Sequence, residues 1–525
     1  MIETVNLSVA PADAHNSNFI RATIISKLSF AKNTQFTYHL VKRSIDARSK
    51  NVRINLLIEV YIGETPSNTP SPIEYKNVKK SKEVIVVGAG PAGLFAALQL
   101  IENGLKPVVV EQGKNVKERR RDLAAINRNH IVNPHSNYCF GEGGAGTYSD
   151  GKLYTRSTKR GDVRKVLQTF IDHGADPEIL VDAHPHIGTN KLPGIIESIR
   201  ETIKVHGGEV LFNTQLKDII ISNNQVKGII AHNLETDKSQ ELLADNLILA
   251  TGHSARNIFE LLHSKSIMME AKTFAMGVRV EHPQTLIDAI QYHCNVKEVE
   301  KIRKHLPAAS YSLVHQALGR GVYSFCNCPG GIIAPCATQQ EEVVTNGWSP
   351  SKRNNPYSNS GIVVTIEDED LQAYKAHGVL SGLKYQQALE KAAWESAGKT
   401  QAAPAQKLID FVSSKSSSHI PSNSYQPGTK AVDLHKLLPK EISERLQIGF
   451  KAFGIKMNGY LSEDAVILGV ESRTSSPIRI PRNKETLQHL QIKGLYPCGE
   501  GAGYAGGIAS AAIDGQKCAN AITPS

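Results

Sequence analysis

Several features that would place this chain in a special class are missing from its 525 residues. No apolar run reaches the roughly 18 residues of a membrane span. The first 20 residues lack the basic start and apolar core of a secretory signal peptide, so we expect a cytoplasmic protein with no membrane association. The seven cysteines are odd in number and scattered, which argues against a disulfide scaffold. We find no internal repeat.

The remaining composition, 40% hydrophobic and 21% charged, is that of an ordinary globular protein, and its length predicts two or three domains. The net charge is +10, and residues 114–121 (KNVKERRR) form a basic run. No aromatic-rich basic segment or nucleic-acid module accompanies this run. We therefore interpret it as a solvated helix face and expect no nucleic-acid partner.

The most informative stretch is 84–111. An apolar run at 84–87 predicts a buried parallel strand, which is followed by Gly88-Ala89-Gly90-Pro91-Ala92-Gly93 and a helix-like run to residue 100. Gly104 is placed to end that helix, 107–110 predicts a second strand, and Glu111 closes it. The order of strand, G-x-G-x-x-G, helix, strand and acid predicts a dinucleotide site.

Each part of this stretch has a physical task. Gly88 allows the tight turn, Gly90 lets the backbone approach a pyrophosphate, and Gly93 lets helix and strand pack closely. The helix N-terminus offers free N–H groups to the phosphates. Glu111 can accept hydrogen bonds from a ribose, which argues against NADP and its ribose 2′-phosphate.

The chain divides into three predicted units. Residues 1–78 show strands at 5–9, 35–45 and 52–62 and a helix at 19–28, a β-α-β-β order that suggests a ferredoxin-like module, followed by a linker at 65–72. Within it, 43–48 is dense in charge and is interpreted as a turn with a salt bridge. Residues 79–275 and 466–525 alternate strands and helices as in a doubly wound sheet, with a hairpin around Asn223-Asn224. Residues 276–465 then form an inserted α+β domain.

Three further segments are candidates for ligand contact. Residues 141–153 are rich in glycine, which lets backbone N–H groups crowd against a flat or anionic ligand. Ala250-Thr251-Gly252 follows a predicted buried strand. Residues 496–508 are again rich in glycine and precede an Ala-rich helix, whose N-terminus could stabilise negative charge on a reduced flavin ring.

These four motifs in this order resemble those of FAD-binding proteins of the glutathione-reductase-like superfamily. The blocks GEGGAGTYSDGKL, HIGTNKL, ATGHSAR, YSFCNCPGG, ESRTSSPIRIPR and YPCGEGAGYAGGI are similar to its family of uncharacterised FAD-dependent dehydrogenases. The resemblance covers almost the whole chain. It implies an α/β fold with a Rossmann-like FAD-binding domain, an inserted α+β substrate domain and the small ferredoxin-like module.

The resemblance also implies which residues hold FAD. The expected cofactor contacts are Gly88, Gly90, Pro91, Ala92, Gly93, Glu111 and Gln112 for the ADP half, Gly143, Gly144, Gly146, Thr147, Lys152 and Leu153 beside the ribityl chain and flavin, Leu216 at the adenine, Thr251 and Gly252 at a strand end, and Gly499, Glu500, Gly507 and Ile508 at the ribityl chain and ring. No metal site is expected.

Candidates for catalysis are fewer. Arg473 could clamp a substrate carboxylate or stabilise an anionic flavin, but an ion pair with Glu471 or Asp464 explains it equally simply. A histidine or lysine could transfer protons, since imidazole titrates near neutrality. The side chains in question are His184, His186, Lys191, His253 and Arg256, with a structural role as the alternative for each.

Cys326 and Cys328 stand two residues apart. On a regular strand both would point to the same face, so redox-active thiols that relay electrons from a flavin are conceivable. A C-x-C pair lacks the helical setting of a C-x-x-C motif, however, and buried structural cysteines are common.

Together these observations predict an FAD-dependent oxidoreductase that acts on an unidentified small molecule by hydride transfer to or from FAD. Only one G-x-G-x-x-G, at 88–93, stands in a proper βαβ setting, so NAD(P)H or another electron-transfer partner would bind transiently. The alternatives are a flavin-dependent RNA-modifying enzyme and a flavin-binding sensor or scaffold without turnover. The sequence specifies neither the substrate nor the oligomeric state.

Overall fold

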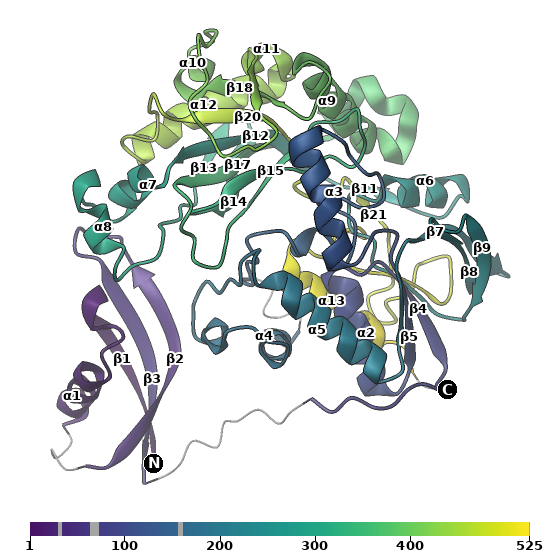
Figure 1. Ribbon diagram of the computed structural model, residues 1–525, viewed down its shortest axis with the longest axis horizontal. Coiled ribbons are helices and arrows are strands. Elements are labelled where there is room, and N and C mark those ends of the chain that lie inside the picture. The colour runs from purple at the N-terminus through teal and green to yellow at the C-terminus, as the bar shows by residue number, and fades with distance from the viewer. Residues whose placement is uncertain (30–33, 64–72, 156–160, 524–525) are drawn as a thin grey trace.

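The computed structural model describes residues 1–29, 34–63, 73–155 and 161–523 (Figure 1). Figure 1 shows a small N-terminal module, a parallel sheet with its helices, and a larger, mainly antiparallel sheet above both. The predicted linker at 65–72 lies outside the described residues. No helix in the described part of the chain is long and apolar enough to cross a membrane.

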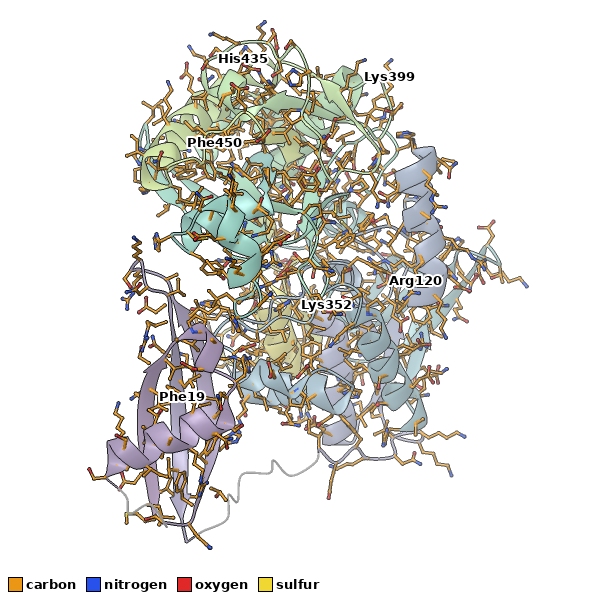
Figure 2. All side chains as sticks on the ribbon, turned by 60° about the vertical axis from the view of Figure 1, so that its left-hand side comes forward. Phe19, Arg120, Lys352, Lys399, His435 and Phe450 are labelled. Carbon is orange, nitrogen blue, oxygen red and sulfur yellow. The ribbon has the colours of Figure 1, made fainter. Side chains whose placement is uncertain are left out.

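The N-terminal module has the predicted β-α-β-β order. Its elements are β1 (Ile2–Val9), α1 (Ser17–Leu28), β2 (Phe36–Asp46) and β3 (Arg53–Ile62). The strands form an antiparallel sheet in the order β1-β3-β2, and α1 covers the face that points away from the rest of the chain (Figures 1 and 2). The described residues between β3 and β4 add no further helix or strand, so the module is the first part of a ferredoxin-like β-α-β-β-α-β unit.

Charged residues join this module to its neighbour. Arg43 lies on β2, where its guanidinium is 2.6 Å from the carboxylate of Glu178 and 2.8 Å from that of Asp182. Its backbone N–H also donates to the carbonyl of Val181. The predicted salt bridge of the 43–48 segment is present between Arg48 and Asp46, at 2.6 Å.

The predicted doubly wound unit is built on a five-stranded parallel sheet. Its order is β22-β10-β4-β5-β6, so the first nucleotide strand and the last strand of the chain share one sheet, as predicted. The strands are β4 (Glu83–Val87), β5 (Lys106–Val110), β6 (Glu209–Leu211), β10 (Leu247–Leu249) and β22 (Leu495–Pro497), and the helices are α2 (Pro91–Asn103), α3 (Val116–Asn129), α4 (Val163–Asp172), α5 (Leu192–Val205), α6 (Arg256–Ser264) and α13 (Ile508–Asn520).

Small residues let α2 and α13 pack closely. A Cβ atom on Gly515 would lie 2.0 Å from the carbonyl oxygen of Ala92, so only glycine fits there. Gly104 ends α2 in the left-handed conformation, with φ of 83°. The predicted hairpin is also present: β7 (Thr214–Ser222) and β8 (Gln225–Asn233) meet at Asn223 and Asn224, whose positive φ angles suit a tight turn, and β9 (Lys238–Leu243) completes that sheet.

The basic run lies on α3 but is not a uniformly solvated face. Arg120 is exposed on this helix (Figure 2), whereas Arg119 is completely buried. Arg119 donates to the carbonyl oxygens of Asn137 (2.8 Å) and Glu142 (2.9 Å). The middle of the run therefore holds the glycine-rich loop in place instead of adding to a basic surface.

The larger sheet has seven strands in the order β13-β14-β17-β12-β20-β18-β19. They are β12 (Phe274–Pro283), β13 (Val314–Ala317), β14 (Arg320–Cys328), β17 (Tyr357–Ile366), β18 (Ala403–Lys407), β19 (Thr429–Ala431) and β20 (Val466–Glu471). Its helices are α7 (Gln284–Gln291), α8 (Val299–Ile302), α9 (Ser381–Ser396), α10 (Leu408–Val412), α11 (Leu434–Leu437) and α12 (Lys440–Lys456). Phe450 of α12 is fully buried in this domain (Figure 2).

Two small pairs complete the structure: β11 (Glu270–Ala271) with β21 (Ile478–Arg479), and β15 (Ile332–Pro335) with β16 (Thr345–Trp348). The domain limits remain predictions, but one difference is clear. The sequence assigns residues 466–471 to the nucleotide-binding unit, whereas β20 pairs with β12 and β18 of the seven-stranded sheet. The strand β20 is buried on both faces, so its continuous apolar sequence is compatible with either sheet.

Candidate functional site

A cavity of about 410 Å³ lies at the carboxyl ends of the parallel strands, where open α/β sheets bind their ligands. Val87, Val110 and Ala250 line it at the ends of β4, β5 and β10. Phe325 of β14 and Asn346 of β16 line the opposite side. The cavity is therefore enclosed by both large sheets.

The G-x-G-x-x-G turn forms one end of this cavity. Gly88 has φ of +104°, and a Cβ atom there would lie 2.4 Å from the carbonyl oxygen of Ala250. A Cβ atom on Gly93 would lie 1.8 Å from the carbonyl oxygen of Gly88, so this glycine lets α2 approach β4. Among the described residues no side chain caps α2 at Gly90, which leaves the N–H groups of its first turn available to a phosphate.

Glu111 is hydrogen bonded to three turns of the chain. Its buried carboxylate accepts hydrogen bonds from the backbone N–H groups of Ala89 (2.9 Å), Gly113 (2.9 Å) and Gly141 (3.0 Å). A carboxylate offers about four acceptor sites, so a further site remains for a ribose hydroxyl. The side chain is held in place for that task before any ligand arrives.

The second glycine-rich segment lies beside the first. The N–H of Gly143 donates to the carbonyl of Ala89 at 2.8 Å, and a Cβ atom on Gly144 would lie 3.1 Å from Cα of Gly90. Gly144, Gly146 and Lys152 line the cavity.

Other residues of the expected cofactor set lie behind the cavity wall and shape it. Thr147 is buried and its hydroxyl donates to the carbonyl of Glu142 at 2.8 Å. Leu153 belongs to the core beneath α2. The N–H of Gly499 donates to the carboxylate of Asp514 at 2.8 Å.

The other end of the cavity receives the N-terminus of α13. Gly507 is its N-cap, and no side chain in the described structure caps this helix either. Cβ atoms on Gly252, Gly506 and Gly507 would meet nothing within 4 Å, although all three residues line the cavity. The missing side chains leave room for a ligand that spans the two helix N-termini.

The residues at the α2 end suit a polar ring. Leu216, Gln112 and Gln215 line the cavity there, and the buried Oε1 of Gln215 has no hydrogen-bond partner among the described atoms. An unpartnered buried amide oxygen is costly unless a ligand supplies a donor. The cavity therefore fits FAD, with glycine cradles for pyrophosphate and flavin and an acceptor at the adenine end.

Lys152 and Asp150 also line the cavity. The Nζ of Lys152 lies 3.9 Å from the carboxylate of Asp150 and donates to the carbonyl of Asn327. Although burial opposes it, the neighbouring sulfurs of Cys326 and Cys328 and Asp150 raise the pKa of Lys152. Its ammonium group therefore stays charged beside the cavity.

Arg473 lines the cavity, but its donors are used by the protein. They reach Glu390 (2.8 and 3.1 Å), Glu342 (2.7 Å) and the hydroxyl of Thr338 (2.7 Å). The expected partner Glu471 pairs instead with Arg279 at 2.8 Å, and Asp464 is exposed. A guanidinium that pairs with two carboxylates cannot also bind a substrate carboxylate bidentately. The ion-pair alternative therefore describes Arg473, but its partners are Glu390 and Glu342 instead of Glu471 or Asp464.

Arg256 belongs to the same buried cluster. Its guanidinium lies 2.6 Å from Glu342 and 2.8 Å from Glu390, which joins α6 of the nucleotide-binding unit to the large-sheet domain. Although burial opposes it, Arg256 and Arg473 lower the pKa of Glu390 to about 2. The cluster fixes the two domains on either side of the cavity.

His253 is the one histidine of the predicted set in the cavity. Its Nε2 lies 3.0 Å from the carbonyl oxygen of Arg473 and its Nδ1 lies 3.3 Å from the carboxylate of Glu500. Both ring nitrogens are thus engaged, and the ring orients Glu500, which also lines the cavity.

The remaining catalytic candidates lie elsewhere. His184 and His186 line a separate cavity of about 700 Å³ beside the N-terminal module, where Nε2 of His186 lies 3.1 Å from the carbonyl oxygen of Ser351. Burial and the nearby Arg353 lower the pKa of His186. Lys191 is exposed at the start of α5. The structure does not bring His186 or Lys191 to the cavity that fits FAD.

Several cavity residues carry no signal in the sequence. Cys139 and Phe140 follow α3 without a motif, and Phe325, Asn346 and Gly347 come from the large-sheet domain. Their positions depend on how the two sheets meet. The YSFCNCPGG block is the one sequence feature that could have pointed to Phe325.

Models of three protein families match the chain. A pyridine nucleotide-disulphide oxidoreductase domain matches residues 82–266, and an FAD-dependent protein, C-terminal domain-like, matches residues 273–474. A domain of unknown function matches residues 1–61.

Individual proteins and solved structures are also similar to the chain. An uncharacterized protein from Clostridium beijerinckii is 38% identical, over 99% of this chain and 98% of its own length. The thiamine thiazole synthase of Aeropyrum pernix is 28% identical over 34% of this chain and 59% of its own. The open conformation of a flavocytochrome c3 fumarate reductase covers 84% of this chain and 78% of its own at 12% identity, but its TM-score of 0.33 is too low to carry an argument.

Proposed function

The chain belongs to a family of FAD-dependent oxidoreductases that join a pyridine nucleotide-disulphide oxidoreductase domain to an FAD-dependent C-terminal domain, and we propose that its FAD occupies the 410 Å³ cavity. The pyrophosphate would lie at the N-terminus of α2, and Glu111 would accept from the adenosine ribose. The flavin would lie between the 144–152 loop, the N-terminus of α13 and Phe325.

One observation carries this proposal. Three glycines of the cavity wall, Gly252, Gly506 and Gly507, have open space where a side chain would be, and the uncapped N-termini of α2 and α13 line the same cavity. Uncapped N–H groups around an empty groove cost stability unless an anionic ligand uses them. FAD has the length and the charge to use both helices.

FAD, when bound, supplies the hydride or electron chemistry. The protein would contribute charge and position. The ammonium of Lys152 and the N-terminus of α13 would stabilise negative charge on a reduced ring. His253 would hold Glu500 against the cavity, and the cluster of Arg256, Glu390 and Arg473 would keep the two domains at a fixed separation.

We propose a small-molecule substrate that reaches the flavin from the side of the large-sheet domain, together with a transient electron partner such as NAD(P)H. The basic run offers little support for an RNA substrate, because Arg119 at its centre is buried in the protein. A sensor without turnover would need no space for a substrate. The cavity also extends to Phe325, Asn346 and Gly347 of the large-sheet domain, where we propose that a substrate binds.

The test is anaerobic reduction of the FAD-loaded protein by NADH, NADPH and a panel of metabolites, followed at the flavin absorbance. Reduction by at least one donor and reoxidation by an acceptor are expected. A protein that binds no flavin even after FAD is added would contradict the cofactor assignment. A bound flavin that no donor reduces would support the sensor alternative.

A further inference from the structure

The thiols of Cys326 and Cys328 lie together because β14 is irregular at this point. Its pairing with β17 shifts register between Phe325 and Cys328, and Cys326 has φ of +52°, which is rare for a residue with a side chain. The thiol of Cys328 donates to the carbonyl oxygen of Cys326 at 3.4 Å, and the two thiols lie close enough to shift each other's pKa. The bulge thus produces a close dithiol that a regular strand would not.

The two sulfurs differ in access. Cys326 is partly exposed and lines the proposed FAD cavity, whereas Cys328 is completely buried behind it. Lys152 comes from the opposite, glycine-rich loop, and its Nζ lies 3.9 Å from Sγ of Cys326. A cation therefore faces the thiol at the point where the two domains meet.

The surrounding charges favour a thiolate at Cys326. The hydrogen bond from Cys328, together with Lys152 and Arg279, lowers the pKa of Cys326 to about 5 against the opposing effect of burial. The same hydrogen bond and burial raise the pKa of Cys328. The charged groups that face the pair are Lys152, Arg279, Asp150 and Glu471.

We propose that Cys326 and Cys328 are a redox-active dithiol that exchanges two electrons with the flavin; the proposal rests on the FAD site described above. In the oxidative direction an S–S bond forms between the two sulfurs and the proton on Cys328 is released. The oxidised flavin takes up both electrons and that proton. The negative charge thereby moves from sulfur to the reduced flavin, while the ammonium of Lys152 faces the same region in both states.

The reverse direction also balances. A flavin reduced by its substrate returns two electrons and one proton to the disulfide, the S–S bond breaks, and one sulfur remains a thiolate beside Lys152. The pair would therefore store a second pair of electrons, so that the protein holds about four electrons per flavin instead of two. The chemical class of partner that this store serves is a two-electron donor of the nicotinamide type.

The first test is an anaerobic dithionite titration of the FAD-loaded protein, with free thiols counted at each step. Wild type, first oxidised, should take up about four electrons per flavin, and two thiols should be gained over the titration. Cys328→Ser and Cys326→Ser should each take up about two. Cys294→Ser is the control, because Cys294 is a free cysteine that belongs to neither the pair nor the cavity lining, and it should behave as wild type.

The second test needs no turnover. The fully reduced holoprotein is alkylated with iodoacetamide between pH 5 and pH 9, and the modified cysteines are located by mass spectrometry. Cys326 should react fastest at pH 6, and its rate should change little above that pH, because the thiolate is the nucleophile. In Lys152→Met the rise in rate should move to higher pH.

The outcomes separate this proposal from the cofactor assignment. Protein that binds no FAD contradicts the FAD site itself. Protein that binds FAD but takes up only two electrons, with no change in thiol count, overturns the dithiol alone. The same conclusion follows if Cys294→Ser loses the additional electrons while Cys326→Ser keeps them.

Discussion

Replacement of Gly507 by threonine tests the proposed flavin position without disturbing the protein itself. A Cβ atom at this position meets no protein atom within 4 Å, and φ of 164° is extended backbone that any residue adopts. Gly507 is the N-cap of α13, where threonine and glycine are about equally favourable. The apoprotein should therefore keep its stability to within about 0.5 kcal/mol.

FAD binding should respond differently, because the branched side chain would point into the space assigned to the cofactor. Inserting extra carbon atoms into a filled site costs about 1–3 kcal/mol. The Kd for FAD should rise about 5- to 150-fold, since each 1.4 kcal/mol is tenfold. The threonine hydroxyl would also compete with the ligand for the N–H groups of the first helical turn.

The assay is a titration of apoprotein with FAD, followed by quenching of the flavin fluorescence, together with urea unfolding of the apoprotein. Gly194→Ala on α5 is the matched control, because its Cβ also meets nothing within 4 Å but points to solvent. It should bind FAD as wild type does. An unchanged Kd in Gly507→Thr would refute the placement of FAD at this helix.

Three further predictions concern titratable groups in different parts of the protein. Glu390→Gln leaves the buried guanidiniums of Arg256 and Arg473 with one carboxylate fewer, and it should lower the free energy of unfolding in urea by about 3–5 kcal/mol. The pKa of Glu390 is lowered to about 2, so the ionised carboxylate stabilises the wild-type protein above about pH 4.5. That stabilisation should be lost as the pH falls toward 2. Glu281 should have the opposite effect, because burial raises its pKa to about 7 and the folded protein keeps a proton that the unfolded chain releases. The free energy of unfolding should therefore fall as the pH rises from about 4.5 to 7. Glu281→Gln should reduce this dependence on pH. His186→Gln should change the Kd for FAD less than about twofold, since His186 lines the other cavity; a tenfold change would show that this cavity also belongs to the cofactor site.

The elements that the sequence predicted best are those with local causes. The strand, turn and helix from 84 to 104 need no distant partner to be recognised, because glycine spacing and an apolar strand specify them. The β-α-β-β order of the N-terminal module and the hairpin at Asn223 follow equally from local patterns. Glu111 ends its strand where the motif requires it.

The ion pairs could not be predicted in this way. Arg473 pairs with Glu390 and Glu342, which are 83 and 131 residues away, while the nearby Glu471 pairs with Arg279. Which carboxylate meets which guanidinium depends on the packing of the two sheets. The sequence neighbours of Arg473 were therefore poor guides to its partners.

The C-x-C pair shows the same limit at the level of the backbone. A regular strand would place both thiols on one face. Nothing in YSFCNCPGG predicts the register shift between Phe325 and Cys328 that changes this arrangement. Lys152 approaches from a loop 174 residues away. The sequence identified the two cysteines as candidates, and only the packing of the glycine-rich loop against β14 places Lys152 beside Cys326.

A crystal structure of the protein with FAD tests the central claim most directly. We expect the pyrophosphate at the N-terminus of α2, a ribose hydroxyl on Glu111, and the flavin ring between Gly507, Lys152 and Cys326. A cofactor bound in the cavity beside His186, or a flavin ring remote from Cys326 and the N-terminus of α13, would contradict the account.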